Sequence, residues 1–280
     1  MRLGNAELHI LNDGHFLKDG GGLFGLVPKV LWQKVFPADD INRVSLALHC
    51  LLIISEGKRI LVDTGLGTKL SSKESEILVL RRDGGGLLDH LQRLGHAPED
   101  IDIVINTHLH SDHCGGNTRL RGGVLEPTFP NAEYWIQRQE WAQARYPNER
   151  TAHVYLAENL VPVQESDQLK LLSGDRRVTG EVRCVVTRGH TQAHQSVIIE
   201  SGGETAVLVG DLAPIAVHME RLGWIPAYDT EPLETLETKR SMRNWVLERR
   251  ALLIFEHDVH MPMGYLVADR GHFRVQAPRT

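Results

Sequence analysis

Short runs of aliphatic residues, many of them β-branched, alternate along this chain with segments that carry Gly, Asp or Asn. Runs of this length, bounded by turn-forming residues, are typical of β-strands. In the first half, the predicted strands are residues 7–11, 45–54, 59–62, 101–105 and 133–136. In the second half, they are residues 182–186, 196–199, 205–209, 251–255 and 265–275. The pattern therefore predicts a protein built from many short strands.

Apolar residues spaced three or four positions apart predict helices between some of these strands. Residues 87–94 carry such a stripe, and a helix over 138–145 follows the strand that ends at 136. The best helix is 232–250, with Pro and Glu in its first turn and two arginines at its end. Strands followed by a helix occur in both halves, which favours two sheets packed face to face with helices outside. The triple-glycine clusters 20–22 and 84–86 are predicted to be loops within one domain.

Composition and charge narrow the class of protein. The chain has 280 residues, 41% of them hydrophobic, and a net charge of -5. This balance argues against a nucleic-acid-binding surface, which is normally strongly basic. The sequence has no run of about 18 apolar residues that would span a membrane, and because its first residues lack an apolar h-region we expect no signal peptide. Because the three cysteines form an odd, sparse set, we expect a reducing, cytoplasmic environment.

The most informative segment follows the predicted strand 101–105. Between His108 and Asn117 it reads His-Leu-His-Ser-Asp-His-Cys-Gly-Gly-Asn, with three histidines and an aspartate in the first six positions. Imidazole and carboxylate are the ligands that suit zinc, iron, manganese or cobalt. Without a metal, the six ring nitrogens would need partners within one turn of chain. The segment therefore predicts a metal site.

Three further strands also end in a residue that can bind metal: His190 after strand 182–186, Asp211 after strand 205–209, and His257 after strand 251–255. Taken alone, each has a simpler explanation, such as a histidine in a turn or an aspartate that caps the next segment. Their order along the chain strengthens the interpretation of all three as metal ligands. We expect these strand ends to converge on one edge of the sandwich.

Together these motifs resemble those of the metallo-β-lactamase-fold hydrolases, in the branch of the lactonases and organophosphate hydrolases. The resemblance covers most of the chain and rests on His108-x-His110-x-Asp112-His113, Gly189-His190-Thr191, Val209-Gly210-Asp211, Phe255-Glu256-His257-Asp258 and Leu61-Val62-Asp63-Thr64-Gly65. It implies an αββα sandwich of two mixed β-sheets flanked by helices, within a single domain spanning residues 1–280.

The resemblance also implies a site for two divalent metal ions, with Zn²⁺ expected first and Fe, Mn or Co as alternatives. The implied ligands are His108, His110 and His190 for metal one, Asp112, His113 and His257 for metal two, and Asp211 as a bridge. A hydroxide between the metals would attack an ester-like bond of a lactone, ester or phosphotriester. The catalytic residues would be Asp211 and Asp112, the latter as a proton carrier to the leaving group.

Other positions receive supporting roles. The resemblance implies that Asp63 and His194 support the ligands without binding metal themselves. Cys114 fits no ligand position and is expected to be a small packed side chain. Some β-lactamases have a zinc-binding cysteine where Asp211 stands here, and its absence argues against β-lactam hydrolysis. The other histidines are expected to be structural or on the surface, although His260 could reach the pocket rim.

The substrate is expected to be a small molecule, and its identity stays open. The apolar stretch 20–32 could form a pocket wall, pack against the sheet, or make a homodimer contact. Acyl-homoserine lactonases have a tyrosine soon after the bridging aspartate. Here Leu212-Ala213-Pro214 follows, so that contact would be missing or supplied by Tyr228. This departure argues against acyl-homoserine lactone as the natural substrate.

Three alternative functions remain. A glyoxalase II-like thioester hydrolase would share the ligand set, and a persulfide-dioxygenase-like oxidoreductase would hold one iron. A binding module without activity is the third, but this chain keeps all seven implied ligands. Metal analysis would separate two hydrolytic ions per chain from one iron.

Overall fold

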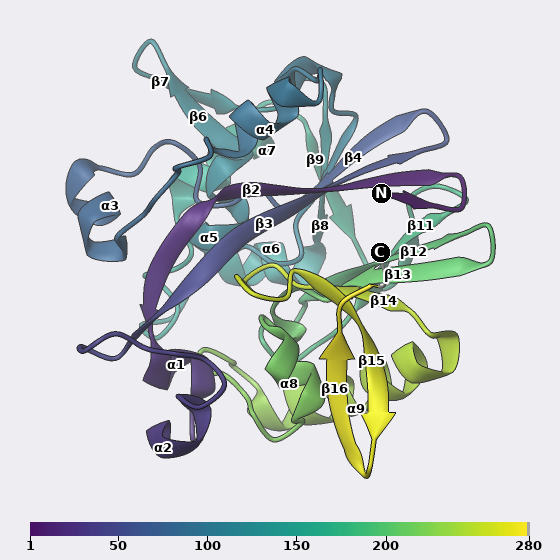
Figure 1. Ribbon diagram of the computed structural model, residues 1–280. Coiled ribbons are helices and arrows are strands. Elements are labelled where there is room, and N and C mark those ends of the chain that lie inside the picture. The colour runs from purple at the N-terminus through teal and green to yellow at the C-terminus, as the bar shows by residue number, and fades with distance from the viewer. Residues whose placement is uncertain (279–280) are drawn as a thin grey trace.

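Two mixed β-sheets lie face to face in the computed structural model, which describes residues 1–278 (Figure 1). The first sheet has the order β1-β2-β3-β4-β5-β8-β9. Its strands are β1 (Arg2–Leu3), β2 (Ala6–Asp19), β3 (Arg43–Ser55), β4 (Lys58–Val62), β5 (Ile103–Ile105), β8 (Glu133–Gln137) and β9 (Leu169–Leu172). This sheet is antiparallel from β1 to β4 and parallel from β4 to β9.

The second sheet runs in order from β10 to β16 and is antiparallel except where β13 pairs with β14. Its strands are β10 (Arg176–Arg177), β11 (Val182–Val186), β12 (Gln195–Ser201), β13 (Glu204–Leu208), β14 (Leu252–Ile254), β15 (Met263–Asp269) and β16 (His272–Gln276). A separate hairpin consists of β6 (Thr118–Arg121) and β7 (Val124–Pro127). The predicted αββα sandwich of two mixed sheets is confirmed.

The central strands are buried on both faces, which explains their almost continuous apolar sequences. In β3, Leu51 and Ile53 face the core between the two sheets, whereas Cys50 and Leu52 face an outer core that includes residues of α4 and α6. In β13, Ala206 and Leu208 face the inner core, and Val207 faces the outer core beneath α9. Alternation along each strand therefore supplies apolar side chains to two layers at once.

Three helices agree with the sequence prediction: α4 (Leu87–Arg93), α6 (Arg138–Arg145) and α9 (Pro232–Arg249). The remaining helices are short: α1 (Gly20–Phe24), α2 (Lys29–Trp32), α3 (Ser72–Leu78), α5 (Ser111–Cys114), α7 (Val161–Glu165) and α8 (Ala216–Glu220). Four short 3-10 helices complete the elements: η1 (Pro98–Asp100), η2 (Gly115–Asn117), η3 (Ala157–Asn159) and η4 (Gly210–Leu212). In the described part of the chain, no helix has both the length and the apolar character needed to cross a membrane.

Two local predictions were wrong. The glycines at 20–22 open α1 and are not a loop, because the Asp19 side chain accepts a hydrogen bond from the Gly22 amide and caps the helix. The single strand predicted over 265–275 is a hairpin of β15 and β16. Its turn contains Arg270 and Gly271, both with positive φ. The stretch 20–32 also contributes to the core, since Phe24 and Trp32 are buried and stack with ring centroids 4.7 Å apart.

Candidate metal centre

The seven predicted ligands lie in segments that follow four strands at one edge of the sandwich. His108 and His110 come after β5, and the next turn of chain, α5, carries Asp112 and His113. His190 follows β11. Asp211 lies in η4 after β13, and His257 follows β14. Because β13 and β14 are parallel neighbours, their C-terminal ends bring Asp211 and His257 to the same edge.

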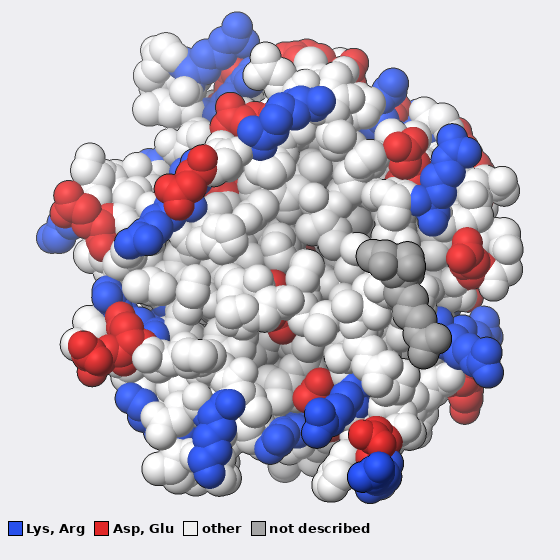
Figure 2. Space-filling model, in the orientation of Figure 1, with Lys and Arg blue, Asp and Glu red and all other residues white. Residues whose placement is uncertain are grey.

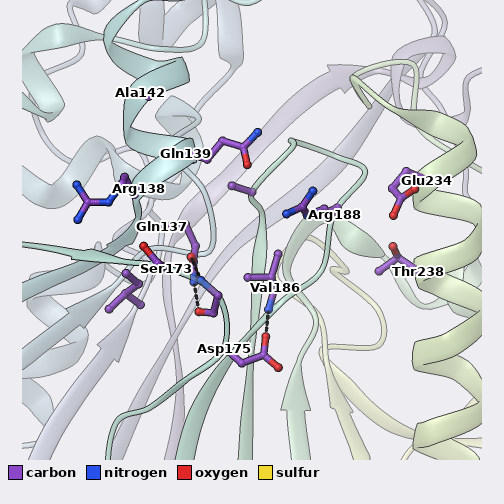
Figure 3. Close-up of a pocket in the computed structure, with 13 residues that line it drawn as sticks. Gln137, Arg138, Gln139, Ala142, Ser173, Asp175, Val186, Arg188, Glu234 and Thr238 are labelled. Atoms are coloured by element: carbon purple, nitrogen blue, oxygen red, sulfur yellow. Dashed lines mark hydrogen bonds between the residues drawn. The ribbon is translucent and has the colours of Figure 1, made fainter.

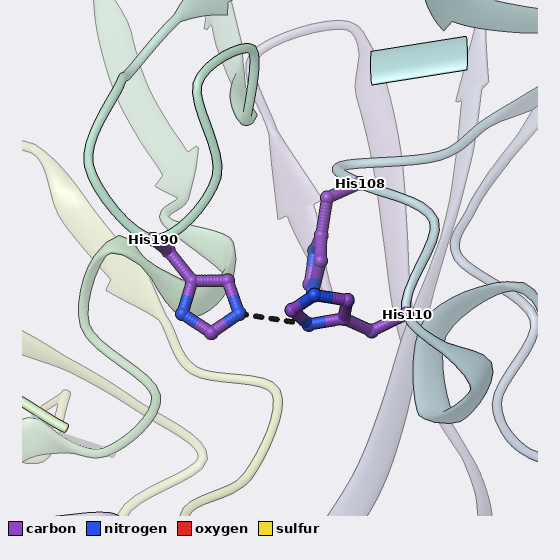
Figure 4. Close-up of side chains that lie close together, drawn as sticks. All are labelled: His108, His110 and His190. Carbon is purple, nitrogen blue, oxygen red and sulfur yellow. Dashed lines mark hydrogen bonds between the residues drawn. The ribbon is translucent and has the colours of Figure 1, made fainter. Parts of the chain in front are cut away.

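The side chains of all seven residues meet there, and the predicted convergence is observed. His108, His110 and His190 point toward one another from two loops (Figure 4). The ligand atoms of these three histidines lie within 4.8 Å of one another, and the same limit holds for the group Asp112, His113 and His257. A third group, His108, His113 and Asp211, connects the two. Asp112 is half-buried and the other six residues are buried.

Asp211 lies between the two groups of ligands. One carboxylate oxygen, Oδ2, is 3.3 Å from Nε2 of His190. The other, Oδ1, is 3.2 Å from Nε2 of His257 and 3.6 Å from Nε2 of His113. Each oxygen of one carboxylate therefore faces a different set of histidines, as a bridging ligand would.

Hydrogen bonds at the outer ring nitrogens assign the histidine tautomers. Nδ1 of His113 donates to Asp63 at 2.9 Å, and Nδ1 of His257 donates to the Ala47 carbonyl at 2.7 Å. Nδ1 of His190 donates to Asp229 at 2.9 Å. In these tautomers each Nε2 has a lone pair directed into the centre.

The arrangement fits a cation. Nε2 of His113 and Nε2 of His257 are 3.0 Å apart, and two lone pairs this close repel unless a metal ion or a proton lies between them. Nε2 of His108 and Oδ1 of Asp211 are buried without a hydrogen-bond partner. Buried polar atoms of this kind are costly unless they coordinate an ion. The centre is therefore suited to bind divalent metal.

The pKa values of the centre reflect burial among charged neighbours. Burial and the neighbouring histidines hold the pKa of His108 well below its usual range. Burial also acts to lower the pKa of His113, but the carboxylates of Asp211 and Glu256 raise it well above its usual range. Burial acts to raise the pKa of Asp211, but the charges of His257 and His113 outweigh it and hold this pKa well below its usual range. The carboxylate of Asp211 is thus ionised, as a metal ligand must be.

The expected supporting residues lie next to the ligands. Asp63 accepts hydrogen bonds from the Thr107 amide at 2.8 Å and the Thr107 hydroxyl at 2.5 Å, in addition to the bond from His113. His194 accepts the Asp211 amide on Nε2 at 3.0 Å, which leaves no lone pair for metal. Cys114 is buried, and its thiol faces the Leu109 carbonyl.

Sequence reasoning missed three buried acidic residues around the centre. Asp229 orients His190 from 39 positions away. Glu140 joins two ligand loops, since its carboxylate accepts from the Leu109 amide at 3.0 Å and from the Thr191 hydroxyl at 2.5 Å. Glu256 is buried beside His113, and burial together with the Asp63 charge raises its pKa well above the usual range. Glu256 lies within the motif Phe255-Glu256-His257-Asp258, so its position could have suggested a role. The sequence around Asp229 and Glu140 contains no motif that would have identified them.

A cavity of about 350 Å³ opens onto the centre. Ligands and apolar side chains line it together, among them His110, Asp112, His190, Asp211, His257, Leu23, Leu46 and Pro214. Tyr228 also lines it, as does Leu23 from the 20–32 stretch, so two of the open candidates for substrate contact are at the cavity wall. His153, expected to be structural or on the surface, is exposed and lines the cavity as well.

A second cavity, of about 570 Å³, lies between α6, the end of β11 and α9 (Figure 3). Its lining mixes Arg138 and Arg188 with Asp175 and Glu234, and none of the seven predicted ligands reaches it. On the face drawn in Figure 2, charged side chains of both signs lie mainly around the periphery. No single-sign surface that would suit nucleic acid is visible on this face.

A family model described as the Metallo-beta-lactamase superfamily matches residues 46–247 of the chain. Six of the seven predicted ligands fall within this match, and His257 follows it.

The curated relatives include N-acyl homoserine lactonases. That of Bacillus cereus is 29% identical over 233 residues, which covers 80% of this chain and 86% of the relative. The lactonase AttM of Rhizobium radiobacter is 26% identical over 189 residues, covering 64% and 66% of the two chains.

Solved structures share the fold along the whole chain. A probable metal-dependent hydrolase from Staphylococcus aureus superimposes with a TM-score of 0.89 and 29% identity, with 100% of both chains covered. AidC, a dizinc quorum-quenching lactonase, gives a TM-score of 0.82 at 21% identity and covers 100% of this chain and 97% of its own.

Proposed function

The chain belongs to the metallo-beta-lactamase superfamily and is a metal-dependent hydrolase, and from this premise we propose that it uses two cations to cleave ester-like bonds. The substrate class is a lactone or ester, with phosphotriesters as a further candidate. The lactonase relatives support the choice of an ester-type bond. The apolar cavity wall beside the centre supports a small organic substrate.

We assign the seven side chains as the sequence motifs predicted. The proposed ligands are His108, His110 and His190 for one ion, Asp112, His113 and His257 for the other, and Asp211 as the bridge. Zn²⁺ is the first candidate, and Fe, Mn or Co would suit the same nitrogen and oxygen ligands. When bound, the two cations supply Lewis acidity toward the substrate oxygen and make a water nucleophile available at neutral pH.

The chain's own residues bind, orient and move protons. Asp63, Asp229 and the Ala47 carbonyl fix the ring orientation of three ligand histidines, so the centre needs little rearrangement during the reaction. Leu23, Leu46 and Pro214 exclude water from one side of the cavity.

Asp112 lines the cavity and carries two carboxylate oxygens, one of which would remain free when the other binds metal. Burial raises its pKa, but the charges of Lys18 and His113 more than offset this and hold the pKa below the usual range. We propose that the free oxygen of Asp112 accepts the proton that the water nucleophile releases and passes it to the leaving oxygen of the substrate.

One observation carries the two-cation proposal. The single carboxylate of Asp211 faces His190 through one oxygen and His257 through the other, while Nε2 of His113 and Nε2 of His257 face each other at 3.0 Å. One ion at either group of histidines would leave the other group without a positive charge.

The test is metal analysis of the purified protein, followed by assays on a lactone, an aryl ester, a thioester and a phosphotriester. We expect two divalent ions per chain and turnover of the lactone or the aryl ester. One iron per chain with oxygen consumption would overturn the proposal in favour of a dioxygenase. Turnover of the thioester alone would instead indicate a glyoxalase II-like enzyme.

A further inference from the structure

Two cationic side chains line the metal-site cavity without belonging to the proposed ligand set. Lys18 lies on β2, and Arg150 lies in the segment that follows α6. Within residues 1–278, no carboxylate oxygen lies within 4.0 Å of the side-chain nitrogens of either residue. The carboxylates in the cavity lining are those of Asp112 and Asp211, and both are assigned to the cations.

Lys18 and Arg150 both contact the same short segment of the cavity wall, residues 227–228. Nζ of Lys18 lies 5.6 Å from the ring centroid of Tyr228 and 5.5 Å from that of Phe16. From the other side, Nη2 of Arg150 donates a hydrogen bond of 2.7 Å to the Ala227 carbonyl. Contacts with aromatic faces and a carbonyl position these groups without neutralising their charges.

Tyr228 is itself fixed in place between them. Its hydroxyl lies directly against the backbone of Gly22, where a β-carbon would overlap it. Gly22 belongs to α1, the capped turn that follows the strand carrying Lys18. The wall segment 227–228, which Lys18 and Arg150 contact, is therefore held in place by α1 on one side and by Arg150 on the other.

With two divalent ions bound, the residues that line the cavity would carry more positive than negative charge. The two lining carboxylates, Asp112 and Asp211, would be used by the ions, and neither Lys18 nor Arg150 forms an ion pair with a described residue. Like charges in a partly dehydrated cavity repel one another, and an anionic ligand relieves this repulsion. An uncharged substrate would leave it in place.

We propose that Lys18 and Arg150 form an anion subsite that selects esters or lactones carrying a carboxylate away from the scissile bond. This inference rests on the proposed function and names its substrate class. An N-acyl homoserine lactone has no such charge, so the preferred substrate would differ from the one in the names of the relatives. Lys18 and Arg150 would act as specificity-determining residues, and the hydrolytic step itself would remain with the metal centre.

The experiment compares matched ester pairs with the metal-loaded protein. The mono-para-nitrophenyl esters of adipic and pimelic acid carry a terminal carboxylate, and para-nitrophenyl hexanoate and heptanoate replace it with a methyl group. We expect kcat/KM to favour the anionic ester of each pair by about tenfold or more, the usual size of a hydrogen-bonded charge contact. The preference should shrink as ionic strength rises.

Variants assign this preference to the subsite. Lys18→Met keeps the aliphatic stem and should lower the anionic-to-neutral ratio of kcat/KM about tenfold, whereas Lys18→Arg should retain the ratio. Lys73→Met, at an exposed position on α3, is the matched control and should not change the ratio. A wild-type protein without preference for either anionic ester would overturn the inference. An equal loss on both esters in Lys18→Met would do the same.

Binding without turnover separates this inference from the proposed function. Adipic acid mono-anilide and hexananilide present the same pair of end groups on an amide, and their affinities can be measured by calorimetry. Tighter binding of the mono-anilide that is lost in Lys18→Met supports the anion subsite even if no ester is hydrolysed. Equal binding of the two anilides contradicts the subsite even if both esters are hydrolysed.

Discussion

Residues that are buried side by side around the candidate metal centre have different roles: some are proposed to bind metal, and others orient those ligands. Three of the proposed ligand histidines, His113, His190 and His257, have their outer nitrogens held by Asp63, Asp229 and a backbone carbonyl respectively. Among the described residues, Asp211 has the one carboxylate that lies within 4.0 Å of histidines in both groups. A change at Asp211 should therefore affect both cations, whereas a change at an outer partner should weaken the binding of one.

Replacement of Asp211 tests the bridge. Asp211→Ala removes both oxygens, and we expect metal stoichiometry and hydrolysis to fall together to background. Inductively coupled plasma analysis and an aryl-ester assay on the same preparation measure both. His260→Ala is the control, because its ring packs 5.5 Å from that of Phe36, and metal content should not change. Full activity of Asp211→Ala with intact metal would contradict the bridging role.

Replacement of Asp229 tests the outer partners. Asp229→Ala frees the His190 ring to change tautomer and orientation, so metal affinity should fall about 10–100-fold. Competition with a chromophoric chelator measures this affinity. Glu237→Ala, at an exposed position on α9, serves as the control. Unchanged affinity in Asp229→Ala would mean that its hydrogen bond does not orient His190.

At the level of elements, α9 supports the loop that carries Tyr228 and Asp229. Lys239 on this helix is 0% exposed, and its ammonium donates to the carbonyls of Leu222 at 3.1 Å and Trp224 at 2.7 Å. Burial lowers the pKa of Lys239 to about 7, with Asp229 acting to raise it and Arg243 to lower it further. The helix therefore holds the loop through a group that loses its proton near neutral pH.

This titration predicts the pH dependence of stability. Above about pH 7 the folded protein holds Lys239 neutral, whereas an unfolded lysine stays protonated to about pH 10.4. Unfolding then takes up a proton, so this residue's contribution to the free energy of unfolding rises with pH across that window, by at most about 1.4 kcal/mol per pH unit. Urea titrations of wild type and Lys239→Met from about pH 6 to 9 measure it. Parallel curves for the two proteins would show that Lys239 does not titrate in this range.

The contact between the His190 loop and α9 requires a glycine. Gly189 has a φ of +137°, and a β-carbon there would overlap Thr235 at the start of the helix. Gly189→Ala should cost about 2 kcal/mol or more in the free energy of unfolding, since strain and overlap add. Gly203→Ala is a matched control at a φ of +84° with no atom within 4 Å, and should cost only about 1 kcal/mol. If Gly189→Ala and Gly203→Ala lower the free energy of unfolding equally in chemical denaturation, the contact between Gly189 and α9 does not contribute to stability.

For the whole molecule, the metal centre joins loops from both sheets. Without metal ions, ring nitrogens crowd together at this junction, as at His113 and His257, and must share protons in place of the ions. Chelation should therefore lower the Tm, and added Zn²⁺ should restore it, because the ions bind the folded state preferentially. Differential scanning fluorimetry measures the shift in Tm. In Asp211→Ala, chelator should lower the Tm much less. A wild-type Tm that does not change on addition of chelator would argue against a metal centre that stabilises the fold.

Much of the fold could be predicted because strands buried on both faces have a strong local signal. The runs that became β3 and β11, and the helices α6 and α9, were recognised from their own residues. Several short elements were missed. β9, β10 and α1 have too few residues to show a period, and the turn at 270–271 was hidden within an apolar pattern. Their conformations depend on neighbouring strands and caps.

The sequence by itself determined the chemical types at the centre and their order, because each ligand follows a strand with its own apolar pattern and belongs to a recognisable motif. Only the tertiary structure decided which distant residues complete the site. The pairing of His190 with Asp229, the joining of two ligand loops by Glu140, and the placement of Lys18 and Arg150 on one wall all depend on the path of the chain. Hydrophobic periodicity reports which face of an element is buried, and it does not report which other element will cover that face.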